Sequence, residues 1–542
     1  MTGQPSAEPA TKRARDPDVW LARVAWAVVA LSLLQILVFG FGRDQGIYAV
    51  VGDAVLHGRM PYRDAWDFKP PGIFVVYAFA EALFGRSMAS VRLVEIASLI
   101  AMVVVLRRLG RDLFGAPVAG LLGGALAVLI HAELEFWHTA QPEAFGGVLT
   151  VFGLAMTIGG GTSMPRIRER AVCWFAAGLL FGAAFLMKPP LGGGAIVCAA
   201  YSARAEYDDE RRAVRFVLPV VVMALGSALP IGVCALWFWI RGAWPNLAWT
   251  LFEFTPGYTA LGWNGTALGF YRYAFFELLV GFSFVVPLGL VAAAALRPIH
   301  GREREALLIV AGIVSVHVAG IALQAKFFQY HYSATLPLVA WAAGVGLYKL
   351  WRRALGWRAP GVILYATIVI ALVAARVSLR HNPGTFWERS LDRMKFLVLR
   401  EPSRAELDQK LYHVVDYDLA VDRRAAAVVA RFAPPGDSIF VWGFEPAVYW
   451  FAERPPASRY VYDVPQRASW QRAHARRELM QDLATMPPAV IVVEHGDVFD
   501  FVTGDDLDSH RALATFQELD RLIDTGYDLV DTVDDLDVYA RR

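Results

Sequence analysis

Long apolar runs, each close to the length of a membrane-spanning helix, recur along the first two thirds of this 542-residue chain. A helix needs about 20 consecutive apolar residues to cross the hydrocarbon core of a bilayer. Hydrophobic residues make up 56% of the sequence and the mean hydropathy is +0.40. The sequence therefore predicts a polytopic α-helical membrane protein.

About eleven runs qualify as transmembrane spans on length and hydropathy. They are residues 20–41, 91–105, 116–132, 143–159, 171–187, 191–202, 216–240, 275–296, 306–323, 334–347 and 361–377. The apolar stretch 73–84 is shorter and carries Glu81, so we expect it to lie at the membrane interface as a helix.

Basic residues occupy every second connection between these spans, and such residues are retained on the cytoplasmic side. They are Arg13 and Arg15, Arg107 with Arg108 and Arg111, and the Arg- or Lys-containing segments 166–170, 204–215, 297–304 and 349–358. This pattern places residues 42–90, the opening loop, on the outer face. Because the span count is odd, the C-terminus is expected outside too, in a multi-pass protein of the cytoplasmic membrane.

The composition divides the chain into three parts. Residues 1–16 are predicted to be a disordered cytoplasmic tail, residues 17–379 the transmembrane domain, and residues 380–542 an extracytoplasmic α/β domain. In the last part the expected strands are 438–442, 460–463, 490–494 and either 529–533 or 537–540, with helices at 423–432, 472–485 and 509–524. It has no glycine-rich phosphate loop, so we assign it no nucleotide.

Overall charge and cysteine content exclude some functions. The chain has 52 basic and 50 acidic residues and a net charge of +2, which argues against nucleic acid as a partner. Its cysteines, Cys173, Cys198 and Cys234, all lie in apolar runs without metal-type spacing, and we interpret them as small hydrophobic residues.

The opening loop concentrates charge where the first span ends. Asp44, Asp67 and Lys69 lie in it, and charged groups cost several kcal/mol in hydrocarbon. These residues therefore indicate a hydrated site at the bilayer surface.

The opening loop also carries a family resemblance. Its segments D-Q-G-I-Y (44–48), H-G-R-M-P-Y-R-D (57–64) and W-D-F-K-P-P-G (66–72) resemble the GT-C superfamily, and within it the bacterial protein O-mannosyltransferase and lipid A aminoarabinose transferase group. Weaker matches are Phe84-Gly85 with Arg92, Pro142-Glu143, Lys188-Pro189 and V-W-G-F-E-P at 441–446. The resemblance implies a GT-C fold. It also implies transfer of a sugar from a polyprenyl-phosphate donor to a hydroxyl of a lipid, polysaccharide or protein acceptor on the outer face.

Such a transfer needs a carboxylate to take the acceptor proton, and the resemblance assigns this role to Asp44 in an inverting reaction. The alternative is that Asp44 only caps the helix that follows it. Many relatives carry Asp-Glu here, whereas this chain has Gln45, which can hydrogen-bond a sugar but binds a divalent cation weakly. A metal is therefore not expected, although Asp67 and Glu143 leave it open.

Cations and aromatic residues are the candidates for the donor phosphate. Lys69 precedes a Pro-Pro pair, Lys188 repeats this arrangement, and the resemblance favours Tyr330 and His331 at the donor site. The alternatives are lysines that extend to lipid phosphates and an ordinary aromatic belt.

Glu143 opens a span at its N-terminus and is expected, with Gln45 and Asp67, near the acceptor or sugar; capping explains it equally well. His131, Glu133, Glu135 and His138 match no established ligand spacing, so no metal site is predicted. The rival interpretation is a transporter or flippase, which would place charges at mid-membrane in repeated halves. Here the charges lie at span ends.

Overall fold

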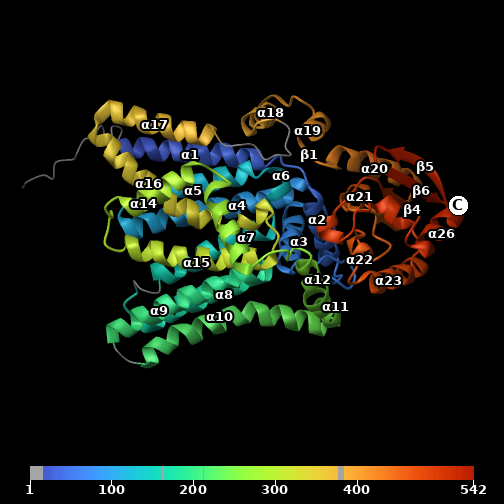
Figure 1. The fold of residues 1–542 in the computed structure, drawn as a ribbon, viewed down its shortest axis with the longest axis horizontal. Helices are drawn as coiled ribbons and strands as arrows, with labels where there is room; N and C mark the ends of the chain where they lie inside the picture. The colour runs from blue at the N-terminus through green and yellow to red at the C-terminus, as the bar shows by residue number, and fades with distance from the viewer. Residues whose placement is uncertain (1–15, 161–163, 211–212, 376–383) are drawn as a thin grey trace, which may run out of the picture.

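The computed structural model describes residues 16–160, 164–210, 213–375 and 384–542. Apart from Asp16, the expected N-terminal tail lies outside these residues. Figure 1 shows long helices packed side by side at one end and the C-terminal region (residues 384–542) from α20 (Leu419–Phe432) onward at the other, with α18 (Phe386–Leu399) and α19 (Arg404–Leu411) beside the bundle. The two helices of the opening loop, α2 (Arg43–Leu56) and α3 (Gly72–Phe84), lie between the two ends.

Within the described residues, six helical segments are long and apolar enough to cross a membrane. They are α1 (Pro17–Ile36), α4 (Met88–Phe114), α7 (Pro142–Ala155) continued by η2 (Met156–Gly160), α8 (Ile167–Met187), α10 (Ala213–Ile240) and α15 (Glu303–Gln324). The chain is an integral multi-pass membrane protein, as predicted. The expected count of about eleven spans is not reached, because six segments, or seven with one bent pair, meet both criteria.

The bent pair corrects one predicted span. Residues 275–296 were expected to form a single crossing, but α13 (Ala267–Val280) and α14 (Val285–Ala295) meet at 97°. Pro287 explains the break, since a proline lacks the amide hydrogen and its ring clashes with the carbonyl of residue 283 in a continuous helix. Gly281, a weak helix former, lies in the connection.

The remaining predicted runs also fall on helices. These are α5 (Pro117–Glu133), η3 (Pro189–Gly193) with α9 (Gly194–Glu210), α16 (Leu336–Gly356) and α17 (Arg358–Ala374). Shorter elements are α6 (Glu135–His138), α11 (Trp244–Trp249), η4 (Thr250–Phe254), α12 (Thr255–Ala260) and η5 (Gln329–Tyr332). The predicted interfacial stretch 73–84 is helical, as α3.

Glycines allow the central helices to approach closely. A Cβ atom at Gly344 of α16 would lie 2.3 Å from the backbone nitrogen of Gly123 in α5. A Cβ atom at Gly346 would lie 1.8 Å from the carbonyl oxygen of Gly289 in α14. Small residues at such contacts let backbones pack directly in membrane proteins. This packing holds α16 in the centre of the bundle, where most of its residues are buried.

The C-terminal region contains a four-stranded sheet in the order β3-β4-β6-β5. Its strands are β3 (Ile439–Trp442), β4 (Val490–Glu494), β5 (Tyr527–Val533) and β6 (Leu536–Arg541). β3 and β4 are parallel, whereas β6 is antiparallel to both β4 and β5. The predicted mixed α/β character of this region is confirmed, and both candidate C-terminal segments are strands that form a hairpin.

The C-terminal region also contains helices and a small hairpin. They are α18 (Phe386–Leu399), α19 (Arg404–Leu411), β1 (His413–Val414), β2 (Tyr417–Asp418), α20 (Leu419–Phe432), α21 (Ala447–Ala452), α22 (Val464–Arg467), α23 (Arg472–Thr485), α24 (Asp500–Thr503), α25 (Ser509–Leu513) and α26 (Gln517–Gly526). The predicted helix 509–524 is therefore two helices, with Ala514, Thr515 and Phe516 between them.

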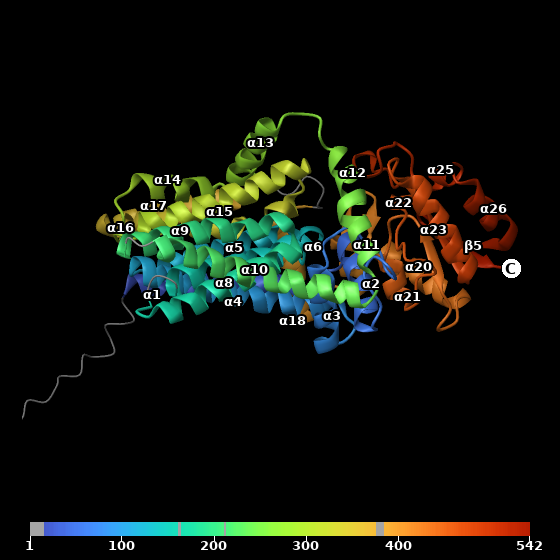
Figure 2. The same cartoon turned by 90° about the horizontal axis from the view of Figure 1, so that it is seen from below.

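The predicted strand 460–463 is wrong. Tyr460 forms an isolated bridge with Trp66 of the opening loop, and the Trp66 amide donates to the Arg459 carbonyl at 2.7 Å. This segment therefore pairs with the opening loop and not with the sheet. Figures 1 and 2 also show α11 and α12 against the C-terminal region, where Trp470 donates to the Phe254 carbonyl at 3.1 Å.

Candidate functional site

Asp44 lies in the first turn of α2, at the end of the bundle that meets the C-terminal region. Its side chain is half-buried and accepts one hydrogen bond, from Gln141 Nε2 at 3.1 Å. The N-terminus of a helix favours a carboxylate because the backbone dipole is positive there. The Asp44 carboxylate thus lies beside a helix end, with oxygen capacity left to accept another hydrogen-bond donor.

Gln45 is hydrogen-bonded to the backbone through both amide atoms, and its predicted contact with sugar or acceptor stays a prediction. Its Oε1 accepts from the Gly42 amide at 2.9 Å, and its Nε2 donates to the carbonyls of Phe136, Trp137 and Thr139. The residue is fully buried. Because both amide atoms bind backbone, Gln45 fastens α2 to the α6 turn.

Lys69 reaches across from the opening loop to the loop before α16. Its ammonium donates to the Tyr330 hydroxyl at 3.2 Å and lies 5.1 Å from the centre of the Tyr330 ring. Burial lowers the pKa of Lys69, but the carboxylates of Asp44 and Glu143, with a smaller contribution from Asp67, raise it by more. The side chain is therefore a cation that lies within electrostatic reach of all three acids.

Glu143 organises a second cation at the same place. It forms an ion pair with Lys188, and His331 Nε2 lies 3.8 Å from its Oε1. The His331 ring is oriented by a 2.6 Å contact between Nδ1 and the Lys326 carbonyl. Among the described residues, the buried Glu143 Oε2 has no hydrogen-bond partner. A hydroxyl donor from a ligand would satisfy this oxygen.

Asp67 connects the opening loop to the C-terminal region. Its Oδ1 accepts from the Tyr462 hydroxyl at 2.7 Å, and the residue is 1% exposed. Burial raises the pKa of Asp67 to about 6, although Lys69 and the Tyr462 hydrogen bond both lower it. Its contact with sugar or acceptor stays a prediction.

The sequence-predicted residues thus come from distant segments to one end of the bundle. Residues from α2, α7, the end of α8 and the loop before α16 share this location with the opening loop, and their charges act on Lys69 and Lys188. Sequence reasoning missed Gln141, which follows no recognisable pattern. It also missed the hydrogen bond from Arg43 to Glu445. Glu445 lies in the V-W-G-F-E-P segment (441–446), one of the weaker matches to the family pattern.

The four acidic and histidine residues of segment 131–138 are not arranged as a metal site. His131 contacts Glu95 at 2.8 Å, whereas Glu135 forms ion pairs with Arg389 and Arg393 of α18. Within the described ranges no group of three His, Cys, Asp or Glu side chains is arranged to hold a metal ion.

Comparison with known proteins gives a family match and a fold match. Residues 68–238 match the model of a family described as dolichyl-phosphate-mannose-protein mannosyltransferase. The chain is similar to ArnT from Cupriavidus metallidurans in the apo state, with 17% identity, 98% of both chains covered and a TM-score of 0.56. It is also similar to that protein bound to undecaprenyl phosphate, with 18% identity, the same coverage and a TM-score of 0.54. No curated protein sequence matches the chain.

These two findings define a fold and a partial family match. The chain as a whole has a fold similar to that of ArnT, an integral membrane protein of the same multi-pass kind. Within that fold, residues 68–238 are similar to the dolichyl-phosphate-mannose-protein mannosyltransferase family.

Proposed function

We propose that this protein transfers a sugar from a polyprenyl-phosphate donor to an acceptor hydroxyl at the outer face of the cytoplasmic membrane, with the C-terminal region outside. The observation that carries the proposal is the half-buried Asp44 carboxylate, which has one protein hydrogen bond and lies in a site with two lysines. This arrangement combines a proton acceptor with cations that stabilise a leaving phosphate. The ArnT structure with undecaprenyl phosphate supports the donor class, since that protein shares the fold.

In the proposed reaction Asp44 takes the proton of the acceptor hydroxyl. The acceptor oxygen attacks the anomeric carbon from the face opposite the phosphate, which inverts that centre. The bond between this carbon and the phosphate oxygen breaks, and its electron pair leaves with the polyprenyl phosphate. Lys69 and Tyr330 stabilise the phosphate directly, with Lys188 and His331 behind them.

Glu143 has two functions in this proposal. Its Oε1 keeps Lys188 in place, while its free Oε2 accepts a hydroxyl of the sugar or acceptor. Asp67 lies beside the same space but is bound to Tyr462. It contributes to the shape and charge of the sugar or acceptor site.

The test is transfer by the purified protein in lipid nanodiscs, using polyprenyl-phosphate sugars and envelope extracts as acceptors. Asp44→Asn should lower the transfer rate about 10²- to 10⁴-fold, the usual contribution of a general base. Asp53→Asn is the matched control, because Asp53 lies on the same helix and pairs with Arg86 away from Asp44. Undiminished transfer by Asp44→Asn would remove Asp44 as the base.

A further inference from the structure

The first turn of α2 is held on two sides. Gln45 fastens it to the α6 turn, as described above. On the other side Arg43 extends into the C-terminal region, where its Nη2 donates to Glu445 at 2.6 Å and to Glu494 at 3.0 Å. Its Nε donates to Glu445 at 3.0 Å and to the Phe444 carbonyl at 3.1 Å. Asp44, between Arg43 and Gln45, accepts a hydrogen bond from Gln141 and has the carboxylate to which we assign the chemistry.

The contact is buried and specific. Arg43 is 3% exposed, Glu445 is 4% exposed and Glu494 is fully buried. Burial lowers the pKa of Arg43, but the carboxylates of Glu445, Glu494 and Asp416 raise it by more, so the guanidinium remains charged. Its planar group meets these partners through several nitrogens at once, a geometry that a lysine ammonium does not reproduce.

The backbone of α2 lies against the C-terminal region at the same place. A Cβ atom at Gly46 would lie 3.1 Å from the Ala447 nitrogen at the start of α21. The first turn of α2 therefore has no room to slide toward the C-terminal region, and Arg43 prevents it from moving away.

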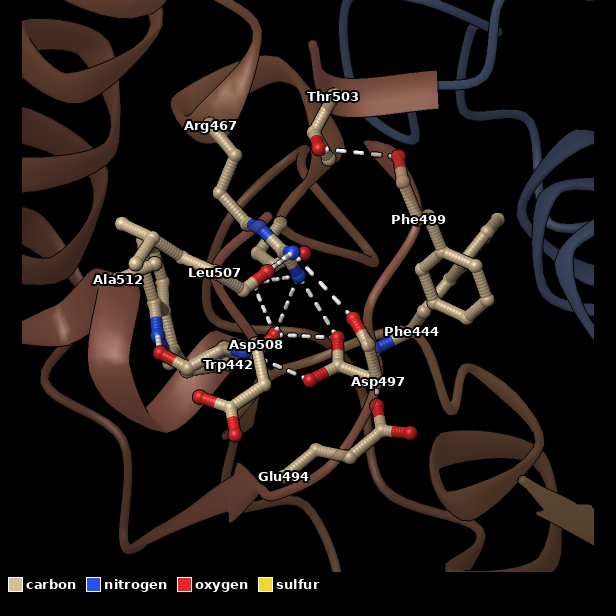
Figure 3. A network of polar contacts seen from close by, with 12 residues as sticks. Trp442, Phe444, Arg467, Glu494, Asp497, Phe499, Thr503, Leu507, Asp508 and Ala512 are labelled. Carbon is tan, nitrogen blue, oxygen red and sulfur yellow. Dashed lines mark hydrogen bonds and ion pairs between the residues drawn. The ribbon is translucent and has the colours of Figure 1, made fainter. Parts of the chain in front are cut away.

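Glu494 is itself fixed by a polar network in the C-terminal region (Figure 3). Its Oε2 accepts from the Phe444 amide at 2.5 Å. The loop that follows β4 is held by Arg467, which donates to Asp497 Oδ2 at 2.7 Å and to the Leu507 carbonyl at 2.5 Å. Arg467 is 1% exposed. The Glu494 carboxylate thus accepts from the Phe444 amide on one oxygen and from Arg43 on the other.

We propose that Arg43 is a positioning residue: its guanidinium, held by Glu445 and Glu494, fixes the first turn of α2 and thereby the Asp44 carboxylate. The C-terminal region then completes the active site from outside the bundle. This inference rests on the proposed function, in which Asp44 is the base. Misplacing a catalytic group by about 1 Å costs up to about 10²-fold in rate.

The test uses Arg43→Lys and Glu494→Gln in nanodiscs, with two readouts. For both variants we expect kcat to fall about tenfold or more and the donor KM to change less than about twofold, because Asp44 moves while the phosphate contacts remain. We also expect faster amide hydrogen exchange in residues 43–47. Glu303→Gln is the control, because it removes a carboxylate from the buried Glu303–Lys349 pair at the far end of the 22-residue helix α15.

The exchange readout needs no activity, so the two proposals fail separately. Unchanged exchange in residues 43–47, or an unchanged kcat in Arg43→Lys when Asp44→Asn is inactive, would overturn the positioning role. An active Asp44→Asn variant would overturn the proposed base, while the exchange data would still report whether Arg43 fixes the turn. If Glu303→Gln lost as much kcat as Arg43→Lys, general destabilisation would explain both losses. That result would also overturn the inference.

Discussion

Lys69→Met tests the donor-phosphate site, because it removes the cation and keeps much of the side-chain volume. The Lys69 ammonium donates to Tyr330 at 3.2 Å and lies in a site with three acids. A hydrogen bond from a charged group contributes about 1.5–3 kcal/mol. Since about 1.4 kcal/mol corresponds to a tenfold change in affinity, the variant should bind undecaprenyl phosphate about 10- to 100-fold more weakly.

Tyr330→Phe provides an internal comparison. It removes a neutral hydroxyl, so its expected loss is about 0.5–1.5 kcal/mol, or about two- to tenfold. Because the Lys69 and Tyr330 polar atoms are in contact, the double variant should lose less affinity than the sum of the single losses.

The assay is isothermal titration calorimetry, which measures the affinity of each variant in nanodiscs for undecaprenyl phosphate. Lys395→Met is the matched control, because Lys395 is an exposed lysine on α18, and its affinity should equal that of the wild type. If folded Lys69→Met bound undecaprenyl phosphate within about twofold of the wild type, the donor site would lie elsewhere and the electrostatic reasoning would be refuted.

Two further predictions concern stability and use thermal unfolding. Glu135→Gln removes the partner of the fully buried Arg393 and should cost about 3–5 kcal/mol, whereas Glu388→Gln on the exposed start of α18 should change the midpoint little. The pKa of Asp67 is raised from 3.8 to about 6. The contribution of the protonated Asp67 carboxyl to folding stability is therefore full below pH 3.8 and is lost as the pH rises through about 6. Asp67→Asn keeps an oxygen for Tyr462 and should be more stable than the wild type above pH 7, by about 3 kcal/mol; an equal difference at pH 5 and pH 8 would contradict this assignment.

Part of the candidate site could be predicted from the residues alone. Asp44 and Lys69 stand out because charges next to an apolar run are costly and their local pattern matches a known family. The backbone contacts of Gln45 could not be predicted, because its amide binds four backbone groups that only the fold brings together. Nothing local to residue 45 discloses which carbonyls of the α6 turn lie next to it.

Hydropathy and strand or helix periodicity determined the membrane class, the location of the apolar helices and the α/β character of the C-terminal region, since these depend on neighbours within one element. The pairing of Tyr460 with Trp66 depended on a contact that such patterns do not include. The tertiary structure alone decided how the site is assembled. Arg43 and Glu445 are 402 positions apart, yet their contact holds the turn that carries Asp44, because buried charges become stable only where the fold brings their partners together.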